Sequence, residues 1–143
     1  MTHLVQAETE IRTAIQAFQT AWAAAHGGVP IIVEMSNREA KDLGNTAVYL
    51  KITIANMPGG GQASLGQNPL IRQEGQILIA AVSRAGAGAL EGQAVLYFLL
   101  PYLSTKDFGL VKTHAAQAVD PKQIKGEWYD NAIVGFWYHY FYS

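Results

Sequence analysis

The stretch that decides the fold lies near the C-terminus and reads WYDNAIVGFWYHYFY, residues 128–142. Apolar side chains recur at alternate positions, as they do on a strand whose successive side chains point to opposite faces of a sheet. One predicted face carries Ile133, Trp137 and Phe141, and the other carries Val134, Phe136, Tyr138, Tyr140 and Tyr142. A strand of this length spans roughly 50 Å, which is longer than usual. One face can pack against helices, so the other needs cover or faces a partner.

Two more strands are predicted upstream, on either side of a glycine-rich connection. The first covers residues 46–55 and alternates cleanly, and the second covers residues 76–83. The connection, residues 56–74, contains Pro58, Gly59, Gly60, Gly61, Gly66 and Pro69. Loops of this length inside a compact domain usually have a function or lack order. We therefore expect an extended hairpin whose long loop, residues 56–74, contacts a partner.

Two helices and several short elements complete the prediction. Residues 4–25 place apolar side chains at spacings of three and four, and Gly27 and Gly28 end this helix. Residues 87–104 form a helix that is apolar on most sides, with Pro101 expected to kink or end it. A short extended run at 31–33, a loop at 36–45, a strand at 110–118 and a turn at Asp120-Pro121 fill the gaps. We predict one α+β domain over residues 1–143, a mixed, mainly antiparallel sheet with both helices on one face.

The composition excludes several classes of function. Half of the residues are apolar and 15% are charged, against about 25% in a typical domain, which hints at a surface that meets a partner. The net charge of −1 gives no basic excess for nucleic acid or for an anionic membrane. There is no cysteine, which excludes disulfides and cysteine–zinc sites. No apolar stretch is long enough to span a bilayer, so we expect synthesis and folding in a cytoplasm.

No pattern of catalytic or cofactor-binding residues emerges. The glycine frame of residues 61–66 resembles a phosphate loop, but Gln67 and Asn68 replace the lysine and the hydroxyl that such a loop needs. Gly86 and Gly88 fit a dinucleotide turn, but Glu91 stands where the third glycine belongs. The four histidines share no metal-ligand spacing. We expect no enzyme activity, no cofactor and no metal.

The order of these features resembles the tail-terminator family of long-tailed bacteriophages and prophages. An amphipathic helix runs into Val29-Pro30 and Asn37, and Arg72-x-x-Gly75 leads into the strand at 76–82. A glycine break and an apolar helix follow at 86–104, then Asp120-Pro121, and Gly126-Glu127-Trp128-Tyr129 opens the long strand. The similarity covers roughly residues 5–142. Ser83-Arg84-Ala85 departs from it, because the family more often has an aromatic residue and a proline there.

The resemblance implies a fold of one mixed sheet and two helices, and a structural role in the virion tail. A terminator forms a homo-oligomeric ring, six-fold in the known cases, on the completed tail tube. The ring stops tube polymerisation and joins the tail to the head, so the expected partners are other copies, the tail tube protein and a head–tail connector protein. Assembly would take place in the host cytoplasm. The candidate assembly contacts are Leu65, Leu70, Arg72, Trp137, Tyr138 and Tyr140.

Two alternatives remain open at this point. Another head–tail connector or a tail-tube subunit would also polymerise, but a tube subunit forms stacks where a terminator stops at one ring. A small-molecule-binding domain, or an unrecognised enzyme using the glycine-rich loop, would instead have a concave pocket with converging polar groups.

Overall fold

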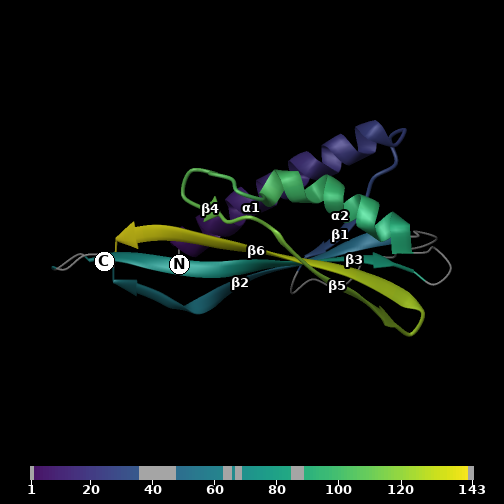
Figure 1. The fold of residues 1–143 in the computed structure, drawn as a ribbon. Helices are drawn as coiled ribbons and strands as arrows, with labels where there is room; N and C mark the ends of the chain where they lie inside the picture. The colour runs from purple at the N-terminus through teal and green to yellow at the C-terminus, as the bar shows by residue number, and fades with distance from the viewer. Residues whose placement is uncertain (1, 36–47, 63–65, 67–68, 85–88, 142–143) are drawn as a thin grey trace.

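The computed structural model describes residues 2–35, 48–62, 66, 69–84 and 89–141. The elements follow the order α1 (Thr2–Ala25), β1 (Ile32–Met35), β2 (Val48–Gln62), β3 (Leu70–Ser83), α2 (Ala89–Leu103), β4 (Lys112–Thr113), β5 (Gln117–Ile124) and β6 (Glu127–Phe141). Both helices lie on the same face of one sheet, as Figure 1 shows. The predicted α+β class is therefore confirmed.

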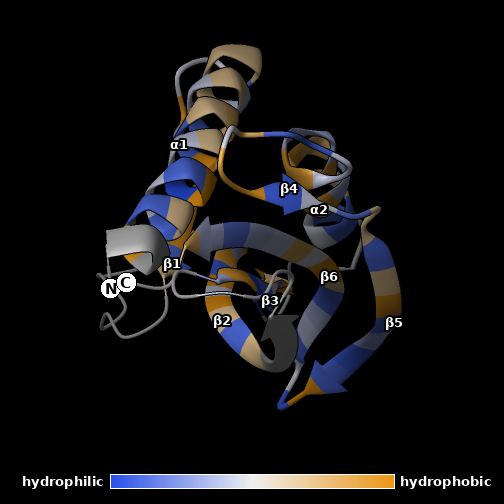
Figure 2. Ribbon diagram, turned by 90° about the vertical axis from the view of Figure 1, so that its left-hand side faces the viewer, coloured by the Kyte–Doolittle hydropathy of each residue, from blue (hydrophilic) through white to orange (hydrophobic). Residues whose placement is uncertain are grey.

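The strands form a six-stranded sheet in the order β1-β2-β3-β6-β4, with β5 also paired to β6. β1 runs parallel to β2, and the other pairs are antiparallel. The sheet is therefore mixed and mainly antiparallel. Seen along the strands, it curls so that β2 and β5 stand at its two sides with the helices above (Figure 2).

The core lies between the sheet and the two helices, because the alternating and helical apolar patterns face each other there. Val134, Phe136 and Tyr138 of β6 are all buried, as one predicted face of the strand requires. From α1, the predicted stripe contributes Ile11, Ile15 and Phe18. Each such burial stabilises the fold by about 1.5–3 kcal/mol, so this layer is the main source of stability.

The helix ends follow their predicted signals. Gly27 and Gly28 adopt positive φ angles of 67° and 85°, a conformation that glycine reaches without steric cost. Pro101 lies in the last turn of α2, which ends at Leu103. A proline this close to the end limits the helix without breaking its interior.

The predicted long loop at residues 56–74 is wrong at both ends. β2 continues to Gln62 and β3 begins at Leu70, and β3 is paired on its other side with β6 as far as Phe141. The pairing of β2 with β3 shifts register between Met57 and Gly61. Glycines fit such a bulge, and ladder hydrogen bonds offset their low strand propensity.

The region after α2 also differs from the prediction. Residues 110–118 do not form one strand, since β4 covers Lys112–Thr113 and β5 starts at Gln117. Asp120 and Pro121 lie within β5, at a register shift between Val119 and Lys122, and the chain reverses at Lys125 and Gly126 with φ angles of 50° and 82°. An irregular edge strand tolerates proline because the missing N–H is not needed there. The predicted loop at 36–45 lies outside the described residues.

Candidate assembly surfaces

The face of the sheet without helices, called here the open face, carries a band of apolar side chains. They lie in register on four neighbouring strands: Met57, Leu78, Val119, Ile133, Trp137 and Phe141. Phe141 is 64% exposed, and Met57, Leu78 and Val119 are 38–39% exposed. A hollow of about 280 Å³ lies over this face, with Lys51 and Lys122 among the side chains that line it. Apolar side chains grouped in this way are typical of a surface that contacts another molecule.

Trp137 is the centre of the open face, and the structure brings it together with Arg72. The Arg72 guanidinium lies 4.5 Å from the centroid of the Trp137 ring. The Nζ atom of Lys112, on β4, lies 5.3 Å from the same centroid. Arg72 is also paired with Glu74 through an Nε–Oε1 distance of 3.0 Å. Cations over an indole ring attract it electrostatically. Two of the predicted contact residues therefore form one local cluster.

The other predicted contact residues are placed differently. Leu70 pairs with Phe141 at the end of the sheet and is partly buried. Tyr140 is half-buried and packs against the edge of the core. Tyr138 is only 2% exposed, so it supports the sheet from inside and presents no surface to a partner. Burial, the largest cause, raises the pKa of the Tyr138 phenol. Leu65 lies outside the described residues.

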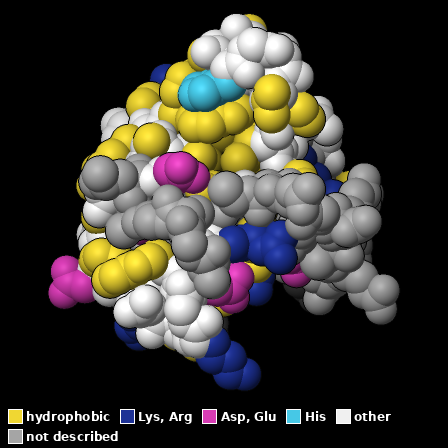
Figure 3. Space-filling model, turned by 90° about the vertical axis from the view of Figure 1, so that its right-hand side faces the viewer, with side chains coloured by type: hydrophobic (Ala, Val, Ile, Leu, Met, Phe, Trp, Pro, Cys, Tyr) yellow, Lys and Arg dark blue, Asp and Glu magenta, His cyan; other side chains and the backbone are white. Residues whose placement is uncertain are grey.

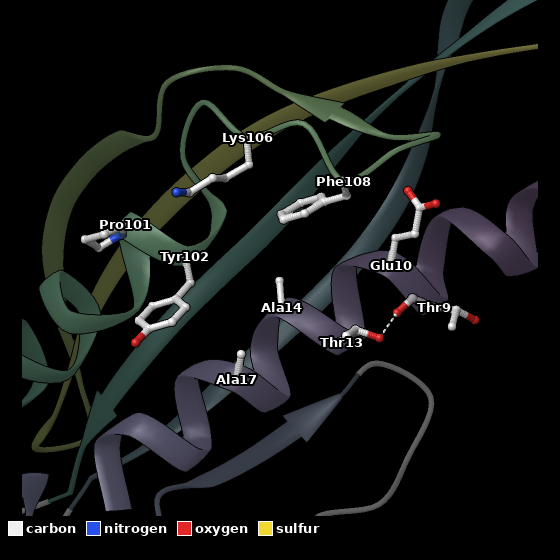
Figure 4. Close-up of a pocket in the computed structure, with 9 residues that line it drawn as sticks. All are labelled: Thr9, Glu10, Thr13, Ala14, Ala17, Pro101, Tyr102, Lys106 and Phe108. Carbon is white, nitrogen blue, oxygen red and sulfur yellow. Dashed lines mark hydrogen bonds between the residues drawn. The ribbon is translucent and has the colours of Figure 1, made fainter. Parts of the chain in front are cut away.

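A second apolar surface lies on the other side of the molecule, between the helices. This helix seam is a groove of about 690 Å³ lined by Thr9, Glu10, Thr13, Ala14, Ala17, Pro101, Tyr102, Lys106 and Phe108. Figure 4 shows Ala14 and Ala17 on α1 facing Tyr102 of α2 and Phe108 of the segment before β4. Small side chains on one wall and aromatic rings on the other make a groove that an apolar side chain can enter.

Three polar residues of the helix seam, Glu10, Thr9 and Thr13, make hydrogen bonds that hold the fold. The Val111 and Leu110 amides donate to the Glu10 carboxylate at 2.9 and 3.1 Å, which ties the segment before β4 to α1. The hydroxyls of Thr9 and Thr13 donate to helical carbonyls one turn earlier, at 2.7 and 2.8 Å. The seam therefore brings together no nucleophile and base, and its volume alone gives little support to a small-molecule site.

An aromatic cluster continues the apolar surface toward the end of α1. The rings of Trp22 and His26 stack at 3.7 Å, and Phe98 meets Trp22 edge-on at 5.2 Å. Tyr102 belongs to this cluster as well as to the seam, since its ring stacks on Phe98 at 6.5 Å. Figure 3 shows hydrophobic side chains gathered on this end of the molecule. The helix layer thus has an apolar outer surface of its own.

No local pattern in the sequence indicates the helix seam, because Glu10 and Leu110 meet across 100 residues of chain. A second feature was missed although its signal was present. Asp130 occupies an inward position of β6, two residues before Ala132, and is 3% exposed. A carboxylate in an inward strand position is a sign of a special environment.

The described residues contain neither a metal-binding cluster nor a membrane-spanning helix. No group of three or more histidine and carboxylate side chains there could hold a metal ion. In the same part of the chain, neither helix has the length and hydropathy needed to traverse a lipid bilayer.

Comparison with known proteins shows that the fold is shared, and it shows no function. No protein-family model matches the sequence, and no curated protein matches it. Ten solved chains match the structure. One of them, for which no function is stated, superposes with a TM-score of 0.62 at 18% identity over 95% of this chain and 97% of its own. At that identity the likeness establishes a shared fold and nothing about function.

Proposed function

We propose that this protein is a structural subunit of a phage tail that forms a terminator ring on the completed tail tube. The ring would stop tube polymerisation and present the surface that joins the tail to the head. The observation that carries the proposal is the pair of unlike apolar surfaces, the open face and the helix seam, on opposite sides of one sheet.

Two unlike surfaces are what a ring requires. In a cyclic assembly larger than a dimer, one patch of each subunit meets a different patch of the next, and the ring closes when the rotation permits. The open face offers Leu78 and Phe141, and the seam offers Ala17 opposite a wall of aromatic rings. A monomer would expose both surfaces to water, which is unfavourable by about 25 cal/mol for each Å² of apolar area.

The proposed partners follow from the same arrangement. Other copies of the chain would fill the ring, with six-fold symmetry as the resemblance implies. The sheet end that carries Leu70, Arg72 and Tyr140 would contact the tail tube protein, and a head–tail connector would bind the other side of the ring. The protein would then reside in the virion tail, after assembly in the host cytoplasm, with no catalysis and no cofactor.

A tube or connector subunit is the second candidate, and the long hairpin favours it. β2 and β3 have 15 and 14 residues, and extended hairpins also serve to stack subunits into tubes. A terminator and a tube subunit differ in the product that they form: one closed ring or a continuous stack.

Native mass spectrometry and electron microscopy of the same sample, across protein concentration and with isolated tail tubes added, test the proposal. We expect single closed rings of uniform subunit number, alone or at the tube end. Leu78→Lys on the open face and Ala17→Arg in the seam should each abolish rings while the monomer stays folded. Thr20→Lys, an exposed substitution on α1, is the control and should leave the rings intact. Stacked tubes would favour the second candidate, and a monomer even on tubes would contradict both.

A further inference from the structure

Two polar side chains lie in the core beneath the first turns of α2. Ser83, the last residue of β3, is fully buried, and Asp130 of β6 is 3% exposed. Within the described part of the chain, no group hydrogen-bonds to Ser83 Oγ or to Asp130 Oδ2. Buried polar atoms are nearly always paired in folded proteins, so two unpaired oxygens at one place need an explanation.

Both oxygens face the backbone of α2 at Gly92. A Cβ atom at position 92 would lie 2.5 Å from Ser83 Oγ and 2.9 Å from Asp130 Oδ2, closer than real Cβ atoms approach. The glycine therefore lets the helix sit directly on the two polar groups. The next residue, Gln93, hydrogen-bonds to the Asp130 carboxyl. The first turns of α2 are thus in direct contact with this carboxyl group.

The surroundings favour the neutral carboxylic acid. Burial is the largest effect and raises the pKa of Asp130, while the hydrogen bond from Gln93 opposes it. Charged side chains on the neighbouring elements include Glu91 of α2, Arg84 after β3, Arg72 and Glu74 of β3, Glu127 of β6, and Asp120 and Lys122 of β5, and none is among the causes of the shift. A helix N-terminus attracts negative charge, but no amide of the described residues donates to Oδ2.

We propose that Asp130 binds a proton and acts as a pH-operated latch for the N-terminal turn of α2. In the latched state the carboxyl is neutral, and its O–H is a donor beside the Ser83 hydroxyl. When the proton leaves, Oδ2 becomes a buried charge without a donor, and the first turn of α2 moves off to admit water. The latch is independent of the proposed function, because it concerns the seating of one helix within one chain.

The direction of the pH dependence follows from the raised pKa. Since the folded protein holds this proton more tightly than the unfolded chain, the stabilisation is fully present below the unfolded pKa of aspartate, about 3.9. It is lost as pH rises through the higher pKa of the folded state. An ordinary surface aspartate in an ion pair shows the opposite trend.

Thermal unfolding of the whole chain and of Asp130→Asn between about pH 4 and pH 8 tests the latch. Asparagine keeps the shape and cannot ionise, so the wild-type midpoint should fall relative to that of Asp130→Asn as the pH rises. Asp120→Asn, which removes an exposed carboxylate on β5, is the matched control and should show no such relative fall. Parallel curves for the wild type and Asp130→Asn would overturn the proposal, and so would a crystal structure with an ordered water bridging the two oxygens.

Hydrogen exchange on the wild-type protein keeps the test decisive if Asp130→Asn fails to fold. After correction for intrinsic exchange, the amides from Glu91 to Val95 should lose protection as the pH rises, while those near Leu99 keep it. Protection that is constant across the range would overturn the latch.

Discussion

Phe136 and Trp137 are neighbours on β6, yet they lie on opposite faces of the sheet and meet different surroundings. Phe136 is 1% exposed and packs beneath the helix layer, across the strand pair from Gly75. Trp137 is half-buried on the open face, where it contacts Arg72, Lys112 and His139. Both are large aromatic residues in one alternating run. The face on which a side chain lies therefore decides whether it packs in the core or is available to contact another molecule.

The largest expected effect is a difference in stability between variants of Phe136 and Trp137. Phe136→Ala removes a fully buried ring and should lower the free energy of unfolding by about 3–5 kcal/mol. Trp137→Ala removes a half-buried ring together with exposed cation–π contacts, so we expect a loss of about 1–2 kcal/mol. Urea unfolding of both variants, followed by circular dichroism, measures the difference.

The loss of ring formation should be governed by Trp137, in contrast to the loss of stability, which should be larger for Phe136. Trp137→Ala leaves a folded monomer with an altered open face, so under the proposed function it should reduce ring formation in native mass spectrometry. Equal losses of stability for the two variants would show that the open face is part of the folding core, and would contradict the separation of roles.

The helix-covered face of the sheet, where Phe136 lies, could be predicted from the sequence. Alternation in β6, the stripe Ile11, Ile15 and Phe18 in α1, and the stops at Gly27 and Gly28 are local patterns, and each was confirmed. The strand ends could not be read in the same way. Residues 56–62 look like a loop because glycine and proline dominate them, but pairing with β3, which is itself paired with β6 on its other side, decides their state.

Substitutions at two glycines, one on each face of the sheet, test the same difference in packing. A Cβ at Gly75 would lie 2.3 Å from Phe136 Cζ and 2.6 Å from the Ala55 carbonyl oxygen. Gly75→Ala should therefore push the Phe136 ring aside and destabilise the fold by up to about 3 kcal/mol, as overpacking does.

Gly135→Ala is the matched change on the open face. Its nearest neighbour is the exposed side chain of His114, with Cδ2 3.1 Å from the new Cβ, and this ring can move into solvent. We expect a change of less than about 1 kcal/mol in thermal unfolding. A Gly135 variant as unstable as the Gly75 variant would mean that the open face is packed as tightly as the covered one.

The candidate surfaces were less predictable than the fold. Arg72 and Trp137 could be named from the sequence, but their meeting depends on the register of β3 with β6. Tyr138 was named as a contact because it is a large aromatic residue, and its place on the covered face excludes it. The helix seam needed a contact between Glu10 and Val111, which are 101 positions apart in the chain, and no local pattern reveals such a contact.

The last comparison concerns the outer wall of the covered side, and its Glu8 control has the smallest expected effect. Glu10→Ala leaves the Leu110 and Val111 amides without their carboxylate, so it should destabilise the fold by about 1–2 kcal/mol and loosen the segment before β4. Glu8→Ala, two residues earlier, removes an exposed carboxylate 3.9 Å from Arg12 and should change stability by less than about 0.5 kcal/mol. Urea unfolding separates the two, and amide exchange at Val111 locates the effect. If Glu10→Ala matches Glu8→Ala in both measurements, water replaces the carboxylate without loss, and the seam is held by the packing of Phe108 and Tyr102 instead.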